Sequence, residues 1–135
     1  MNHRPVSEVM SANVHCVEAE RKVSEVAREM QQKHIGAVMV RRGGEMAGIF
    51  TERDLLNKVV GMGTDPASLP VSAVMTAKFM CVSPEATVEV AAILMHKRGF
   101  RHLPVKDDTG AVVGILSVRD VLAALAPEGG VQPKS

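Results

Sequence analysis

The sequence is poor in aromatic residues and has no excess of charge of either sign. It contains no tryptophan or tyrosine, and aromatic residues make up 2% of its 135 positions. A stacking platform for single-stranded nucleic acid, which needs several exposed rings, is therefore excluded. Sixteen Lys and Arg residues nearly balance 15 Asp and Glu residues, so no overall positive charge attracts DNA or RNA. Any anion site must be local.

Long apolar runs and clusters of metal ligands are also missing. The apolar runs are interrupted well before the ~20 residues that a membrane-spanning helix needs, and the first residues contain no apolar signal region. These features predict a soluble, cytoplasmic protein that does not bind a membrane. Cys16 and Cys81 each lie in an apolar stretch and fit buried strand positions better than a disulfide framework. With the five histidines scattered, the sequence predicts no metal site.

What the chain has in abundance is aliphatic residues, and they are arranged in two similar halves. Hydrophobic residues make up 46% of the sequence, enough for a core of ordinary size. The chain aligns with itself at a shift of about 65 residues, which places Val6 and Ser7 on Val71 and Ser72. We therefore predict a first repeat over residues 1–62, a connector over 63–70, a second repeat over 71–126 and a disordered tail over 127–135.

Each repeat predicts the same order of elements, in a mixed α/β fold of β-α-β-β-α units. A short helical turn (residues 6–10 and 71–75) precedes a strand (14–17 and 79–82). Apolar residues at helical spacing then predict a helix, which ends near Gly36 in the first copy and at Gly99 in the second. Two apolar runs joined by turn residues predict a hairpin (37–41 with 46–50, and 102–106 with 111–116). A last helix is predicted over 52–60, with Gly61 at its C′ position, and over 118–126.

One motif occurs in both repeats, at residues 48–54 and 114–120. It consists of Gly, two apolar residues, Thr or Ser, two spacers of which the second is Arg, and Asp. The motif lies where a strand would end and a helix begin. Its hydroxyl and carboxylate can form a helix capping box. Equally, the carboxylate can accept hydrogen bonds from a ribose diol while the helix start receives a phosphate. Taken alone, the residues favour the cap, although a cap does not require Arg at the same spacer twice.

The ordered set of these segments, repeated twice, resembles a tandem pair of cystathionine-β-synthase (CBS) domains. The resemblance covers residues 5–126 and includes the strands at 35–40 and 100–105. It implies a compact two-repeat module that binds adenosine-containing ligands such as AMP, ADP, ATP, NAD or S-adenosylmethionine and regulates another protein. An enzyme is the main competing class. The chain has no Gly-x-Ser-x-Gly motif and no phosphate-binding Gly-rich loop ending in Lys, so we predict no catalytic residues and no catalytic cofactor.

The resemblance also implies two nucleotide clefts that each combine residues of both repeats. The first would contain Ser117, Arg119, Asp120, Arg101, His102, Ser7, Met10 and Ile35. The second would contain Thr51, Arg53, Asp54, Gly36, Ala37, Ser72, Met75 and Phe100. The clefts would differ, because Arg101 and His102 supply donors for phosphate whereas Gly36 and Ala37 supply none. The alternatives are a solvated strand edge for Arg101 and His102 and ordinary core packing for the methionines.

The apolar residues of the helices predict a homodimer, because a large apolar surface is seldom left in water. The residues concerned are Leu55, Leu56, Val59, Val60, Val121, Leu122, Leu125, Met30 and Met95. An adenosine-containing small molecule and an unknown effector protein are the other predicted partners. A structural or protein-interaction module with empty clefts stays open as the alternative function.

Overall fold

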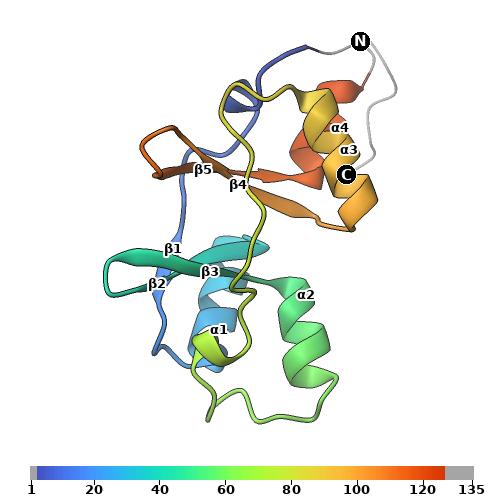
Figure 1. Cartoon of the computed structure of the whole chain (residues 1–135). Coiled ribbons are helices and arrows are strands. Elements are labelled where there is room, and N and C mark those ends of the chain that lie inside the picture. Colours follow the sequence, from blue (N-terminus) through green and yellow to red (C-terminus); the bar gives the residue numbers. More distant parts are fainter. Residues whose placement is uncertain (1–2, 127–135) are drawn as a thin grey trace. The chain divides into compact units, whose positions relative to one another are not determined.

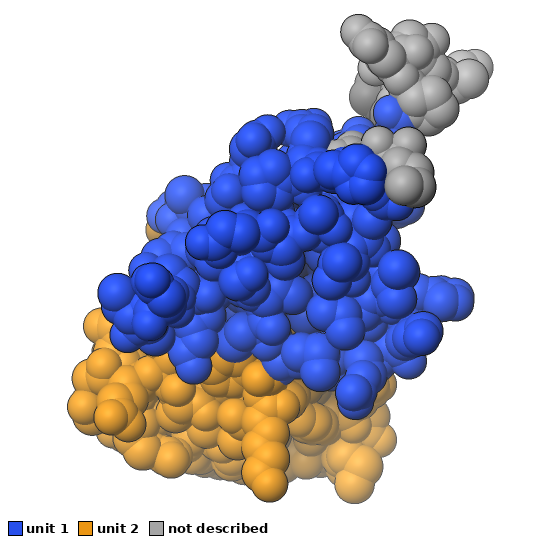
Figure 2. All heavy atoms as spheres, turned by 45° about the horizontal axis from the view of Figure 1, so that its top comes forward, with its two compact units in different colours: residues 1–13, 80–135 blue, residues 14–79 orange. Residues whose placement is uncertain are grey.

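The structure, a computed structural model, describes residues 3–126 and divides into two compact units (Figure 1). Unit 2 is Val14–Phe79, and unit 1 combines residues 3–13 with residues 80–126; Figure 2 colours the two separately. The predicted tail at 127–135 lies outside the described residues. Within the described residues, no helix combines the length and the apolar character that crossing a membrane requires.

Unit 2 contains a three-stranded sheet and two helical segments. Its sheet has the order β1-β2-β3, with β1 parallel and β3 antiparallel to β2. In Figure 1 both helices of this unit lie on the same face of the sheet. In chain order the elements are β1 (Cys16–Glu18), α1 (Val23–Lys33), β2 (Ala37–Arg42), β3 (Glu45–Thr51), α2 (Glu52–Asp54), its π-helical continuation η2 (Leu55–Val60) and the 3-10 turn η3 (Val71–Ala73).

Unit 1 repeats this plan with a smaller sheet. Its elements are the 3-10 turn η1 (Val6–Glu8), α3 (Val88–Arg98), β4 (His102–Lys106), β5 (Val112–Ser117) and α4 (Val118–Leu125). β4 and β5 form the predicted antiparallel hairpin. The strand predicted at 79–82 is wrong in its extent, since only Val82 pairs, as a single parallel bridge to Val105. Hydrogen bonds from Val82 N–H to Pro104 O and from Lys106 N–H to Val82 O form that bridge.

The opening turn of each sequence repeat packs in the core that the other repeat forms. Val6 is fully buried with Leu103 and Leu116 in unit 1, and its N–H donates to Ala86 O at 2.8 Å. Val71 is fully buried in the core of unit 2, and its N–H donates to Arg21 O at 2.8 Å. Each compact unit therefore takes its first turn from the other copy of the repeat.

The predicted helical stripes are confirmed, because the apolar positions of α1 and α3 form one buried face. The buried residues are Val23, Val26 and Met30 in α1 and Val88, Ala91 and Met95 in α3. Met30 and Met95 are buried as the stripe predicts. Of the other apolar residues cited for dimer formation, Val59 and Val121 are also buried in the unit cores and Leu55 is half-buried, so they do not contribute an exposed surface. Those that stay exposed are Leu56, Val60, Leu122 and Leu125.

Two predicted helix ends differ from the structure. α1 closes at His34, which adopts a left-handed conformation with φ 56°, rather than at Gly36. Gly61 has φ −65°, so its predicted left-handed C′ role is wrong. There the helix widens into π-helical turns, and Gly61 N–H donates to Leu56 O at 2.7 Å. Gly99, with φ 72°, closes α3 as predicted.

Candidate functional site

Both copies of the repeated motif lie at a strand-to-helix junction and form reciprocal capping boxes. In unit 2 the Asp54 N–H donates to Thr51 Oγ1 at 3.2 Å, and Thr51 N–H donates to Asp54 Oδ2 at 3.0 Å. In unit 1 the Asp120 N–H donates to Ser117 Oγ at 3.1 Å, and Ser117 N–H donates to Asp120 Oδ2 at 2.9 Å. The capping interpretation of the motif is therefore confirmed, and it fixes each carboxylate at the start of its helix.

The glycine of each motif makes room for a methionine of the opening segment in the same unit. A Cβ on Gly48 would lie 2.6 Å from Met75 Sδ and 2.8 Å from the carbonyl oxygen of Thr76. A Cβ on Gly114 would overlap Met10 Sδ and lie 2.9 Å from Met10 Cγ. Met10 and Met75 are half-buried and pack against the cores of their units. Each methionine thus lies directly over the strand that carries the motif.

Strand pairing places Arg101 and His102 beside the motif of unit 1. His102 is opposite Ser117 in the β4–β5 ladder, and Val118 N–H donates to Arg101 O at 2.8 Å. Arg101 is exposed and His102 is half-buried. The equivalent pair in unit 2, Gly36 and Ala37, has the same backbone arrangement, with Glu52 N–H donating to Gly36 O at 3.0 Å and Ala37 opposite Thr51. Only the copy in unit 1 therefore has two basic residues adjacent in the backbone to the helix start.

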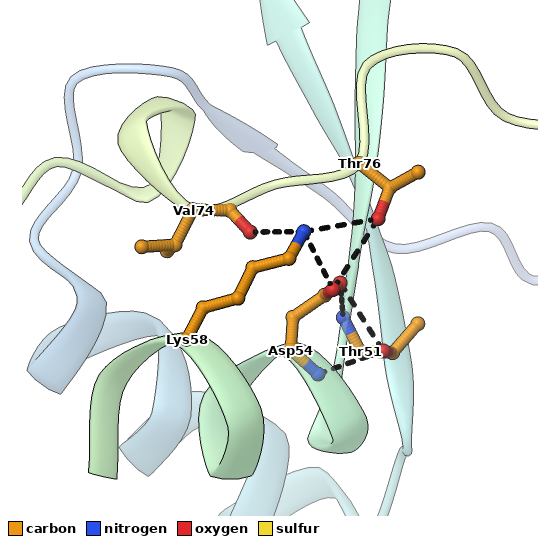
Figure 3. A network of polar contacts seen from close by, with 5 residues as sticks. All are labelled: Thr51, Asp54, Lys58, Val74 and Thr76. Atoms are coloured by element: carbon orange, nitrogen blue, oxygen red, sulfur yellow. Dashed lines mark hydrogen bonds and ion pairs between the residues drawn. The ribbon is translucent and has the colours of Figure 1, made fainter. Parts of the chain in front are cut away.

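In unit 2 the carboxylate of Asp54 is the centre of a closed polar network (Figure 3). Its side chain is 10% exposed. Oδ2 accepts from Thr51 N–H at 3.0 Å and from Thr51 Oγ1 at 3.2 Å. Oδ1 accepts from Thr76 Oγ1 at 3.3 Å and pairs with Lys58 Nζ at 3.0 Å. Four donors thus occupy the roughly four acceptor positions of an ionised carboxylate.

Lys58 is engaged as fully as the carboxylate that it contacts. Besides Asp54, its ammonium donates to Val74 O at 3.2 Å and to Thr76 Oγ1 at 3.3 Å. These three contacts account for the three N–H donors of a lysine. Sequence reasoning missed Lys58 and Thr76, although Lys58 follows Asp54 by four residues, the spacing at which side chains meet on a helix.

In unit 1 the carboxylate of Asp120 has no such network. Ser117 N–H is the one donor to it among the residues that the structure describes, and that bond leaves Oδ1 without a partner. The residue four positions after Asp120 is Ala124, and the counterpart of Thr76 in the repeat is Ser11. Ser11 forms the same backbone bridge to its strand, with Ile115, as Thr76 forms with Ile49. The two copies share their backbone and differ in the side chains that meet the carboxylate.

The structure places the other predicted site residues as follows. The Ser7 N–H donates to Pro84 O within unit 1, and the Ser72 N–H donates to Ala19 O within unit 2. Arg53 and Arg119 are both exposed, at the second helical position of their motifs. Ile35, assigned to the Asp120 cleft, belongs to unit 2, where it packs against the core. Phe100, assigned to the Asp54 cleft, belongs to unit 1 and is 36% exposed.

A second polar cluster ties the segment before β1 to α1 in unit 2. His15 Nε2 contacts Glu29 Oε2, and Arg21 Nη1 lies 3.0 Å from Glu29 Oε1. Hydrogen bonds from His15 and Arg21 hold the pKa of Glu29 below its usual value. No group of three or more potential metal ligands occurs among residues 3–126. Both cysteines are half-buried free thiols, and burial raises the pKa of Cys81.

Comparison with known proteins identifies the family to which this arrangement belongs. The model of the CBS domain matches two segments, residues 6–61 and 71–127, which together cover most of the chain. The chain belongs to the CBS domain family. The predicted tandem pair of CBS domains and its mixed α/β fold are therefore confirmed. Pairs of CBS domains are typically regulatory or sensory modules.

Similar proteins occur in bacteria and plants. The chain is 31% identical to the CBS domain-containing protein YhcV of Bacillus subtilis, over 86% of this chain and 81% of that protein. It is 38% identical to the mitochondrial CBS domain-containing protein CBSX3 of Arabidopsis thaliana, over 78% of this chain and 53% of that protein. The chain thus spans only about half the length of this relative. A protein with CBS domains from Burkholderia ambifaria MC40-6 is 28% identical and superposes with a TM-score of 0.89, over 97% of this chain and 100% of that chain.

Proposed function

We propose that this CBS-domain pair is a regulatory module that binds an adenine nucleotide, AMP, ADP or ATP, at the Asp120 motif of unit 1. The observation that carries the proposal is the state of the Asp120 carboxylate. It is fixed by Ser117 at the start of α4, and one of its oxygens has no hydrogen-bond donor within the described part of the chain. A carboxylate held in this way can accept hydrogen bonds from the two hydroxyls of a ribose.

The surrounding residues of unit 1 suit the other parts of a nucleotide. The N-terminus of α4 carries a partial positive charge that favours a phosphate, and Arg101 adds a fixed positive charge beside it. His102, opposite Ser117 in the ladder, adds a charge that depends on pH. Met10 offers an apolar, adaptable side chain for the base. NAD and S-adenosylmethionine contain the same adenosine group and stay as alternative ligands.

Calorimetric titration with AMP and with adenosine tests this proposal. Replacing Asp120 by Ala removes the ribose acceptor, so both ligands should lose roughly ten- to a hundredfold in affinity. Arg101→Ala should weaken AMP much more than adenosine, because adenosine has no phosphate. The AMP affinity should also rise between pH 8 and pH 6, because protonated His102 would carry a positive charge that attracts the phosphate.

Two results would contradict the proposal. Unchanged affinity in Asp120→Ala would remove the ribose site, and equal losses for AMP and adenosine in Arg101→Ala would reduce Arg101 to a solvated strand edge. Arg42→Ala is a suitable control, because Arg42 is an exposed strand residue of unit 2. It removes one positive charge far along the chain from the motif and should leave both affinities unchanged.

We also propose a homodimer that acts on a separate effector protein. Support for self-association comes from the exposed helical side chains of Leu56 and Val60 in unit 2 and of Leu122 in unit 1, each more than 60% exposed. Apolar side chains grouped on helix surfaces are commonly covered by pairing of identical chains. Light scattering at micromolar concentration measures the mass, and a monomer would contradict this part. The predicted cytoplasmic location stays a prediction from the sequence.

A further inference from the structure

The two copies of the motif differ in how much hydrogen-bonding capacity their carboxylates retain. All four acceptor positions of Asp54 are occupied, by Thr51, Thr76 and Lys58. A ribose diol brings two hydroxyl donors, and both must find an acceptor at the carboxylate. At Asp54 the ribose would have to displace Lys58 and Thr76 first (Figure 3).

Displacing these partners is costly because they hold one another as well as Asp54. Lys58 has no N–H donor left over, and one of its bonds goes to the backbone carbonyl of Val74. Thr76 is in turn held by backbone hydrogen bonds in both directions with Ile49. Each charge-assisted hydrogen bond that is lost lowers affinity by about tenfold or more.

Unit 1 contains the same motif without the two side chains that occupy the carboxylate oxygen Oδ1 in unit 2. Ala124 stands where unit 2 has Lys58, so no ammonium can reach Asp120 from that position. At the position of Thr76, Ser11 is exposed, and within the described residues its hydroxyl makes no hydrogen bond to Asp120. The difference therefore lies in two side chains, not in the backbone.

We propose that Lys58, together with Thr76, keeps the Asp54 motif from binding a ribose, so that the chain binds one nucleotide and not two. Lys58 and Thr76 are then the residues that determine the stoichiometry, and Asp54 has a structural role in unit 2. This inference rests on the proposed nucleotide function, since it concerns which copy of the motif performs it.

The test counts bound AMP per chain by calorimetry or native mass spectrometry of the full chain. The wild-type protein should bind one AMP. Lys58→Met removes the ammonium and Thr76→Val removes the hydroxyl, so in the double variant both acceptor positions of Asp54 Oδ1 are free and the count should rise to two. Adding Asp54→Asn to the double variant should return the count to one. Lys78→Met, at an exposed lysine of unit 2, is the matched control and should still bind one AMP.

A reciprocal variant tests the same idea in unit 1. Ala124→Lys places an ammonium four residues after Asp120 and should weaken AMP binding by about tenfold or more. Ala124 is half-buried against the unit-1 core, so Ala124→Met serves as the control for size without charge. It should bind AMP more tightly than the lysine variant, and equal weakening in both would contradict a role for the charge.

The outcomes separate this inference from the proposed function. Two AMP molecules on the wild-type chain, or one on both wild type and the double variant, would overturn the role of Lys58 and Thr76 while leaving a nucleotide-binding module. No binding to either protein would overturn both proposals. Binding of one AMP to the double variant but none to wild type would support the role of Lys58 and Thr76 and overturn the assignment to Asp120.

Discussion

Replacing the two motif aspartates by alanine should cost different amounts of stability, although the residues occupy equivalent positions in the repeat. Each substitution removes the carboxylate half of a capping box, the hydrogen bond from the N-cap N–H, which contributes about 1 kcal/mol. Asp120→Ala removes little else, because Ser117 is the one residue bonded to its side chain in the described structure. Asp54→Ala also removes the contacts with Thr76 and Lys58.

The additional cost at Asp54 can be worked from those contacts. The hydrogen bond from Thr76 contributes about 0.5–1.5 kcal/mol net. The pair with Lys58 is worth about 0.5 kcal/mol, because the lysine is 43% exposed and water screens it. Asp54→Ala should therefore destabilise by about 2–3 kcal/mol in total and Asp120→Ala by about 1 kcal/mol. For a chain of this length, each kcal/mol lowers the melting temperature by roughly 3–5 °C.

Urea and thermal unfolding followed by circular dichroism measure the two losses. Hydrogen exchange adds the location, since amides of unit 2 should lose protection in Asp54→Ala and amides of unit 1 in Asp120→Ala. Asp108→Ala, which removes an exposed carboxylate in a turn, is the control for net charge. Equal losses at the two motifs, or a larger loss at Asp120, would refute the view that Asp54 is structural and Asp120 available to a ligand.

Two further predictions concern the motif glycines and the Glu29 cluster. Gly48→Ala should lower the free energy of unfolding by about 1–3 kcal/mol more than Gly114→Ala does. A Cβ on Gly48 meets the backbone carbonyl of Thr76, whereas the three atoms nearest a Cβ on Gly114 belong to the flexible side chain of Met10. Equal melting temperatures of the two variants would contradict this prediction. The pKa of Glu29 is lowered from its ordinary 4.5, so its contribution to stability is complete above that value and is lost as the pH falls through the folded-state pKa. Unfolding of wild type and Glu29→Gln should therefore converge in acid, and a gap independent of pH would exclude this role.

Much of the local structure follows from the sequence because its causes are local. The apolar stripes at 23–30 and 88–95 predict helices, since only a helix places such spacing on one face. The hairpins follow from apolar runs separated by turn residues, and the capping boxes from Thr or Ser three residues before Asp. His34 was not predicted as a helix end, because a histidine in the left-handed conformation has no strong local signature.

The sequence by itself therefore determined the repeat, the order of elements, the family and the position of both motifs. Only the tertiary structure decided that Val6 and Val71 each pack in the core formed by the other repeat, because burial depends on contacts between segments far apart in the chain. It also decided that the Asp54 carboxylate has no acceptor position left for a ligand. One of these positions is occupied by Thr76, 22 residues away, whose hydroxyl lies 3.3 Å from Oδ1, and no local pattern of residues encodes that contact.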